Sequence, residues 1–179
     1  MILKRFMVKD IVFLAVMAAL LFLCSAVSMP VMSIDLFGLR NMITAIFYSL
    51  FATVTLMKVP KVGALTLLGF FNAVILFMMS PVMFVTNFCS ALLAEIVVLL
   101  VFKGYEGMKA IVTAACLAPI LALPFTALFS MIINGKAFSE VIQASPTVAL
   151  TCTGTVALSL LGGFLGRKIG GELKKAGKI

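Results

Sequence analysis

Apolar residues occur in six long runs along the chain, and short gaps that hold most of the charged residues separate these runs. The runs lie at about 10–28, 38–57, 62–79, 82–102, 110–133 and 147–165. A helix needs about 20 mostly apolar residues to cross the hydrocarbon core of a bilayer, and each run is close to that length. The pattern predicts an all-α polytopic membrane protein. We expect six transmembrane helices in one compact bundle, with residues 1–179 as a single integral-membrane domain.

The basic residues are distributed unevenly among the gaps. The chain has 14 Lys and Arg residues, and only Arg40 and Lys136 lie in or beside the first, third and fifth gaps. The other twelve lie at the N-terminus, after the second and fourth runs, and in the C-terminal tail. Basic residues concentrate on the cytoplasmic side of membrane proteins, so this distribution predicts that both termini are cytoplasmic.

Composition removes several classes of function. A hydrophobic content of 64% exceeds the roughly 45–50% of soluble domains. Anionic lipid headgroups account for a net charge of +8, so we expect no nucleic-acid partner. The chain has no His, and each of its four Cys residues lies inside an apolar run, where Cys is usually a small packing residue. We therefore expect no metal site and no intrinsic cofactor.

No combination of residues in the sequence suggests catalysis. Paired carboxylates and nucleophile–His pairs are missing, as is a soluble segment long enough for an ATPase. Glu95 is the only acidic residue deep inside a run, where an unpaired charge costs several kcal/mol. It precedes Lys103 by eight residues, or about 12 Å of helix. We favour a structural role for Glu95, bonded to a neighbouring helix or a cytoplasmic Lys, over a substrate contact or proton relay.

Polar side chains gather at the outer ends of the predicted helices. Residues 41, 44 and 48 recur at helical spacing, and such a stripe in a membrane helix faces protein or a cavity. The alternative is a helix cap with interhelical hydrogen bonds. The mixture of amides and thioethers suits a flat, largely apolar compound with a few polar groups, one of them an acidic group facing Arg40. The predicted substrate-binding residues are Met29, Met32, Arg40, Asn41, Thr44, Tyr48, Asn72, Met79, Met83, Asn87 and Asn134.

Small residues at fixed spacing indicate close helix contacts. Ala15, Ala18 and Ala19 lie on or near one face of the first helix, where they allow either a partner helix or an internal neighbour to approach. In the tail, Gly162, Gly166 and Gly170 are four residues apart. No strand precedes this Gly-rich run, which therefore indicates helix packing rather than a phosphate-binding loop. Two prolines, at positions 119 and 124, predict a kink in the fifth helix.

The whole chain resembles the S components of energy-coupling factor (ECF) transporters, and within that group it is most similar to the Trep-Strep branch. The matching stretches are KDIVFLAVMAAL at the start, LLAEIVVLLVFKG in the fourth run and LLGGFLGRKIGGELKKAGKI at the end. S components are multi-pass proteins of prokaryotic cell membranes that capture vitamins and other micronutrients. The resemblance implies six helices with both termini in the cytoplasm.

The resemblance also implies a mechanism. An S component binds its substrate near the outer face, under loops that correspond here to residues 29–37 and 134–146. It then docks on a transmembrane scaffold subunit with two cytoplasmic ATPases, which use ATP, and topples in the membrane to release the substrate. The helix-one alanines, here Ala15 and Ala19, face the scaffold. The substrate is not implied by the resemblance; the mixture of predicted binding residues fits a vitamin or a tetrapyrrole such as haem. Two alternatives stay open, namely a small integral-membrane enzyme acting on lipid or prenyl groups, and a stand-alone secondary transporter.

Overall fold

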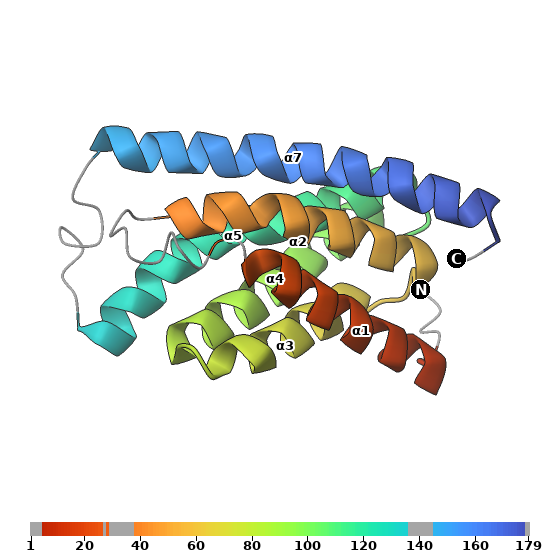
Figure 1. Cartoon of the computed structure of the whole chain (residues 1–179), viewed down its shortest axis with the longest axis horizontal. Coiled ribbons are helices and arrows are strands. Elements are labelled where there is room, and N and C mark those ends of the chain that lie inside the picture. Colours follow the sequence, from red (N-terminus) through yellow and green to blue (C-terminus); the bar gives the residue numbers. More distant parts are fainter. Residues whose placement is uncertain (1–4, 27, 29–37, 136–144, 178–179) are drawn as a thin grey trace.

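The computed structural model describes residues 5–26, 28, 38–135 and 145–177, which form six helices (Figure 1). The all-α prediction is thereby confirmed. The predicted loops 29–37 and 134–146 lie almost entirely outside the described residues. The helices are α1 (Val8–Ser25), α2 (Leu39–Lys58), α3 (Ala64–Phe77), α4 (Pro81–Phe102), α5 (Met108–Asn134) and α7 (Ser145–Lys175).

Five of the six described helices are long and apolar enough to cross a membrane, and α3 is the exception. It has 14 residues, or about 21 Å of helix, against about 30 Å of hydrocarbon. The predicted helix over 62–79 is therefore too long at both ends. Gly63 precedes α3 with a left-handed φ of 93°, and the chain turns after Phe77 to reach Pro81, which starts α4.

The last helix is longer than expected, because α7 continues to Lys175 instead of ending near residue 165. Two of its glycines, Gly162 and Gly166, lie directly against the backbone of α2, where a larger residue would collide. A Cβ added at Gly162 would come within 2.2 Å of the Ile46 carbonyl oxygen. One added at Gly166 would lie 2.7 Å from the Leu50 carbonyl oxygen. The prediction that this run permits close packing is confirmed.

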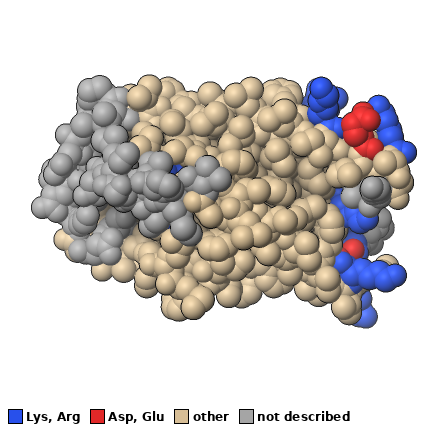
Figure 2. Space-filling model, in the orientation of Figure 1, with Lys and Arg blue, Asp and Glu red and all other residues tan. Residues whose placement is uncertain are grey.

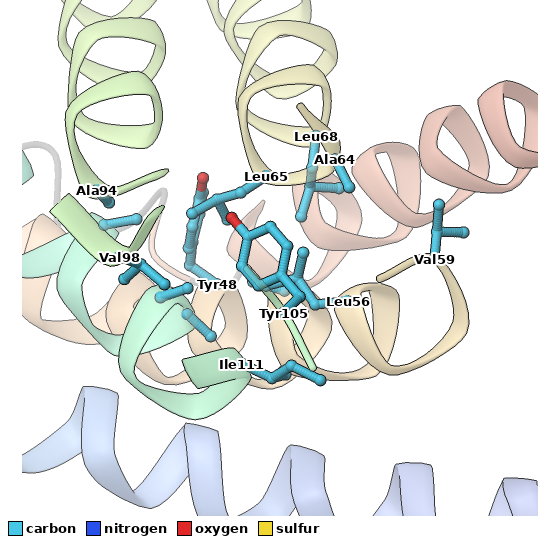
Figure 3. Packing of buried hydrophobic residues seen from close by; sticks show 14 of the residues in the cluster. Tyr48, Leu56, Val59, Ala64, Leu65, Leu68, Ala94, Val98, Tyr105 and Ile111 are labelled. Carbon is cyan, nitrogen blue, oxygen red and sulfur yellow. The ribbon is translucent and has the colours of Figure 1, made fainter. Parts of the chain in front are cut away.

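Helix α2 lies at the centre of the bundle and packs against α1, α3, α5 and α7. In Figure 1, α7 covers one side of α2, while α1, α3 and α4 lie on the opposite side. Leucines of α1, α2 and α3 form a buried cluster together with Tyr48 and Tyr105 (Figure 3). The central position of α2 places its polar residues inside the protein.

The fifth helix runs through both of its prolines as one helical segment. Pro119 has no N–H group, so the carbonyl oxygen of Ala115, four residues earlier, lacks its usual donor. The hydroxyl of Ser49 on α2 donates a hydrogen bond to this oxygen at 3.1 Å. A buried polar link between α2 and α5 thus satisfies the backbone group that the proline leaves free.

Basic side chains gather at one end of the described structure, beside the start of α1 and the end of α7 (Figure 2). At this end Lys61, which precedes α3, forms an ion pair with Asp10 on α1. Lys58, Lys103 and Lys109 lie at the corresponding ends of α2, α4 and α5. The basic residues from alternate gaps of the sequence therefore lie together, and they give the bundle one basic end.

Candidate ligand-binding cavity

A partly open cavity of about 290 Å³ lies between α2, α3, α4 and α5, towards the end away from the basic residues. Each of the four helices contributes residues at helical spacing, so one face of each helix forms a wall. The lining residues are Ser25, Gly38, Arg40, Asn41, Thr44, Tyr48, Asn72, Leu76, Ser80, Val82, Met83, Thr86, Asn87, Ser90, Ala118, Pro119, Ala122 and Thr126. The volume is at the lower end of the range for small-molecule sites.

Most of the predicted binding residues that the structure describes lie on this one cavity. They are Arg40, Asn41, Thr44, Tyr48, Asn72, Met83 and Asn87. Met79 is not a lining residue, but its sulfur lies 3.9 Å from Nη2 of Arg40. Met29, Met32 and the side chain of Asn134 lie outside the described residues. Their role in binding stays a prediction.

Several lining residues were missed by the sequence reasoning. Thr86 and Ser90 follow Met83 by three and seven residues, so they share its face of α4. On α5, Ala118, Ala122 and Thr126 are four residues apart and also share a face. The polar stripe of α2 implies that neighbouring helices also turn polar residues towards the cavity. Looking for such residues on α4 would have identified Thr86. The alanines carried no such signal, because small apolar residues are common on every face of a membrane helix.

The amide side chains connect the walls of the cavity. The Asn41 amide donates to the Thr126 hydroxyl at 3.1 Å, which joins α2 to α5. The Asn72 amide donates to the Asn87 amide oxygen at 3.2 Å, which joins α3 to α4. Asn87 in turn donates to the Met83 carbonyl oxygen at 2.9 Å. The interhelical hydrogen bonds considered as an alternative are therefore present, and they belong to cavity-lining residues.

Arg40 brings a positive charge to the cavity. Its guanidinium is half-buried, and its Nη1 lies 3.1 Å from the Met83 sulfur. Thioether sulfurs are weak acceptors and carry no charge. Among the described residues, no carboxylate forms an ion pair with Arg40. An anionic group that entered the cavity would find this guanidinium on its wall.

Two hydroxyl groups on the cavity wall have no hydrogen-bond partner among the described residues. They belong to Tyr48 and Thr86, whose exposed fractions are 7% and 3%. The Tyr48 ring lies in the buried cluster, and its hydroxyl extends from α2 towards the space between α3 and α4 (Figure 3). A buried hydroxyl without a partner costs about 1–3 kcal/mol. Both oxygens have almost no accessible surface, so a ligand that supplied the missing bonds would first have to displace part of the wall.

Glu95 is not a lining residue, and its carboxylate is fully engaged in structural bonds. One oxygen accepts from the Gly63 N–H at 2.6 Å and the Tyr105 hydroxyl at 3.0 Å. The other accepts from the N–H and the hydroxyl of Thr66. These donors include backbone groups at the start of α3, so Glu95 caps a helix on which it does not lie. This agrees with the structural role expected for it.

Tyr105 completes this arrangement from the loop between α4 and α5. Burial raises the pKa of its hydroxyl, and the nearby charge of Glu95 raises it further. The hydroxyl therefore stays protonated at every physiological pH and keeps its role as a donor to Glu95. The cluster joins α3, α4 and this loop on the basic side of the cavity.

The three alanines of α1 do not share one environment. Ala15 and Ala19 are exposed, together with the apolar side chains of Val12 and Val16. Ala18 has an exposed fraction of 0% and belongs to the buried core, so its assignment to a docking surface is wrong. A helix turns by 100° per residue, so position 18 lies about 80° from the direction shared by positions 15 and 19, on the flank next to the buried Leu14 and Leu21.

The fold and the cavity define a multi-pass α-helical membrane protein with a polar site enclosed by its helices. Residues 8–175 match the Trep_Strep family, described as a hypothetical bacterial integral membrane protein, and the chain belongs to this family. No curated protein and no solved structure matches the chain.

Proposed function

We propose that this protein is the substrate-capture subunit of an ATP-driven importer of the ECF type, for a small micronutrient. The observation that carries the proposal is the cavity between α2, α3, α4 and α5. Its wall combines one guanidinium, three amides and two unpaired buried hydroxyls with apolar surface. Such a mixture is typical of sites that bind and orient a small molecule. The resemblance of the whole chain to S components supports the same function.

The charge distribution supports capture from outside. The cavity lies towards the start of α2 and α4, and Lys58 and Lys103 lie at their opposite ends, with the cluster of basic residues. With the basic end in the cytoplasm, both termini are cytoplasmic and the cavity opens towards the outer face. The protein would then work in the cytoplasmic membrane and meet its substrate outside the cell.

The outer face of α1 supports docking on another membrane subunit. Ala15 and Ala19 lie one turn apart and leave a shallow strip between larger apolar side chains. Small residues at this spacing allow a second helix to approach closely within lipid. In the proposed importer the partner is a transmembrane scaffold with two cytoplasmic ATPases, and these supply all the ATP hydrolysis.

Co-purification tests this function. The tagged protein, solubilised from its own membranes, should retain a scaffold subunit and an ATPase pair. Ala19→Trp should prevent this retention while leaving the protein folded. Ile132→Trp is the matched control, since Ile132 is exposed on α5. Retention of the partners by Ala19→Trp would place the docking surface elsewhere. A stand-alone transporter or a membrane enzyme would function in vesicles without such partners.

The ligand is proposed only as a class. A vitamin-sized compound suits a cavity of about 290 Å³, and a tetrapyrrole such as haem would place one polar edge in it. Mass spectrometry of the purified protein with each compound added separates these two. A stable complex with a compound that has no polar group would count against both.

A further inference from the structure

Polar groups without strong partners lie at two separate levels of the cavity. Arg40 is at the first level, beside the sulfurs of Met79 and Met83. Tyr48 and Thr86 supply the unpaired hydroxyls of the second level. Arg40 and Tyr48 lie on the same helix, eight residues or about 12 Å apart. On α4 the two levels are closer, because Thr86 follows Met83, which the Arg40 guanidinium contacts, by three residues or about 4.5 Å.

The first level fits a carboxylate. A guanidinium presents two parallel N–H groups that match a planar carboxylate, and a charged partner makes these bonds stronger than neutral ones. The contacts with the thioether sulfurs of Met79 and Met83 do not satisfy these N–H donors, because sulfur is a weak acceptor. A partly buried cation of this kind favours an anionic ligand over a neutral one of the same shape.

The second level fits a neutral polar group. Hydroxyls both donate and accept, so Tyr48 and Thr86 suit a hydroxyl, carbonyl or amide of the ligand. A second anionic group is disfavoured here, because the carboxylate of Glu95 follows Ser90 by only five residues on α4. The two levels therefore differ in the charge that they accept.

Apolar residues complete the lining of the cavity. Leu76, Val82, Ala118 and Ala122 contribute to it, and the small alanines leave room for a flat group. Resting on the proposed function, we infer that the captured micronutrient is an organic monoanion. Its carboxylate binds Arg40, its apolar body lies between α3, α4 and α5, and a neutral polar group binds Tyr48 and Thr86.

A matched series of probes tests this inference on the purified full chain in lipid nanodiscs. The acids are ω-(4-hydroxyphenyl)alkanoates with two to five methylenes, each compared with its primary amide and with the acid that lacks the phenolic hydroxyl. Dissociation constants are measured by calorimetry. The acid with the highest affinity should bind at least about tenfold more tightly than its amide. Arg40→Gln should abolish this preference for the acid. Arg167→Gln, at the basic end, is the matched control and should keep it.

A double-mutant cycle tests the second level. Removing the phenolic hydroxyl should weaken binding to the native protein about threefold to tenfold, and should have no effect in the Tyr48→Phe/Thr86→Val variant. Equal binding of acid and amide, or no binding across the whole series, would overturn the inference. So would an acid preference that appears only in Asp35→Asn, because Asp35, which lies outside the described residues, would then be the partner of Arg40.

These results are independent of the proposed transport partners. If the scaffold and ATPases co-purify but the acid preference is missing, the inference about the ligand fails alone. If the acid preference and its loss in Arg40→Gln are found while no partner co-purifies, the site stands and the ECF function fails.

Discussion

Replacing Glu95 by Gln tests whether the one acid buried in the described helices is structural. The substitution keeps the shape of the side chain but converts one carboxylate oxygen into an amide NH₂ group. Glu95 has an exposed fraction of 3% and accepts four hydrogen bonds, two on each oxygen. Whichever way the new amide points, two donors lose their acceptor. The helix cap of α3 also loses its negative charge.

The magnitude follows from these lost bonds. A buried donor left without an acceptor costs about 1–3 kcal/mol, and a charge at a helix N-terminus contributes about 0.3–1 kcal/mol. Hydroxyls can rotate towards other acceptors, whereas the backbone N–H of Gly63 or Thr66 cannot. We therefore expect Glu95→Gln to lower the free energy of unfolding by about 2–4 kcal/mol.

Reversible unfolding in mixed detergent micelles, followed by circular dichroism, measures this loss. Glu106→Gln is the matched control, because Glu106 is an exposed acid of the α4–α5 loop and its substitution should change stability little. Ligand affinity of the folded Glu95→Gln protein should be unchanged, since Glu95 does not line the cavity. Native stability together with lost ligand binding would refute the structural role.

Three further predictions concern packing and the cavity walls. Gly162→Ala should destabilise the protein by about 1–3 kcal/mol, because the new Cβ would collide with the α2 backbone at Ile46. Gly171→Ala is the control and should leave stability unchanged, because a Cβ added there meets no atom within 4 Å. Denaturation of the two variants measures the difference. Ser49→Ala should cost about 1–3 kcal/mol by leaving the Ala115 carbonyl without a donor, and adding Pro119→Ala should recover most of this loss in the same assay. Asn87→Leu should weaken ligand binding in calorimetry about tenfold or more, since it breaks the bridge from Asn72 to α4; unchanged affinity would mean that this wall does not shape the site.

Much of the fold follows from the sequence, because each helix is a local feature. Apolar runs of helical length predict the number and order of the described helices, and the four-residue spacing of Gly162, Gly166 and Gly170 predicts close packing. The errors lie at helix ends. Continuation of α7 to Lys175 and the short length of α3 depend on contacts with α2 and on capping by Glu95.

The candidate site could be predicted in part, for a similar reason. Polar residues of a membrane helix face inward, so the stripe of Asn41, Thr44 and Tyr48 already indicates a cavity wall. Nothing in a single sequence shows which hydroxyls find partners once the helices pack. The free hydroxyl of Thr86 and the bond from Ser49 to Ala115 both arise from tertiary contacts.

Sidedness of labelling tests the central claim, which is that the cavity end faces outside. The four cysteines, none of which forms a disulfide, are first replaced by Ala. Single cysteines are then introduced at Met78, which is 91% exposed at the cavity end, and at Lys109, at the basic end. In intact cells, a membrane-impermeant maleimide should modify Met78→Cys and spare Lys109→Cys until the membrane is opened. Modification of Lys109→Cys alone would contradict capture from outside.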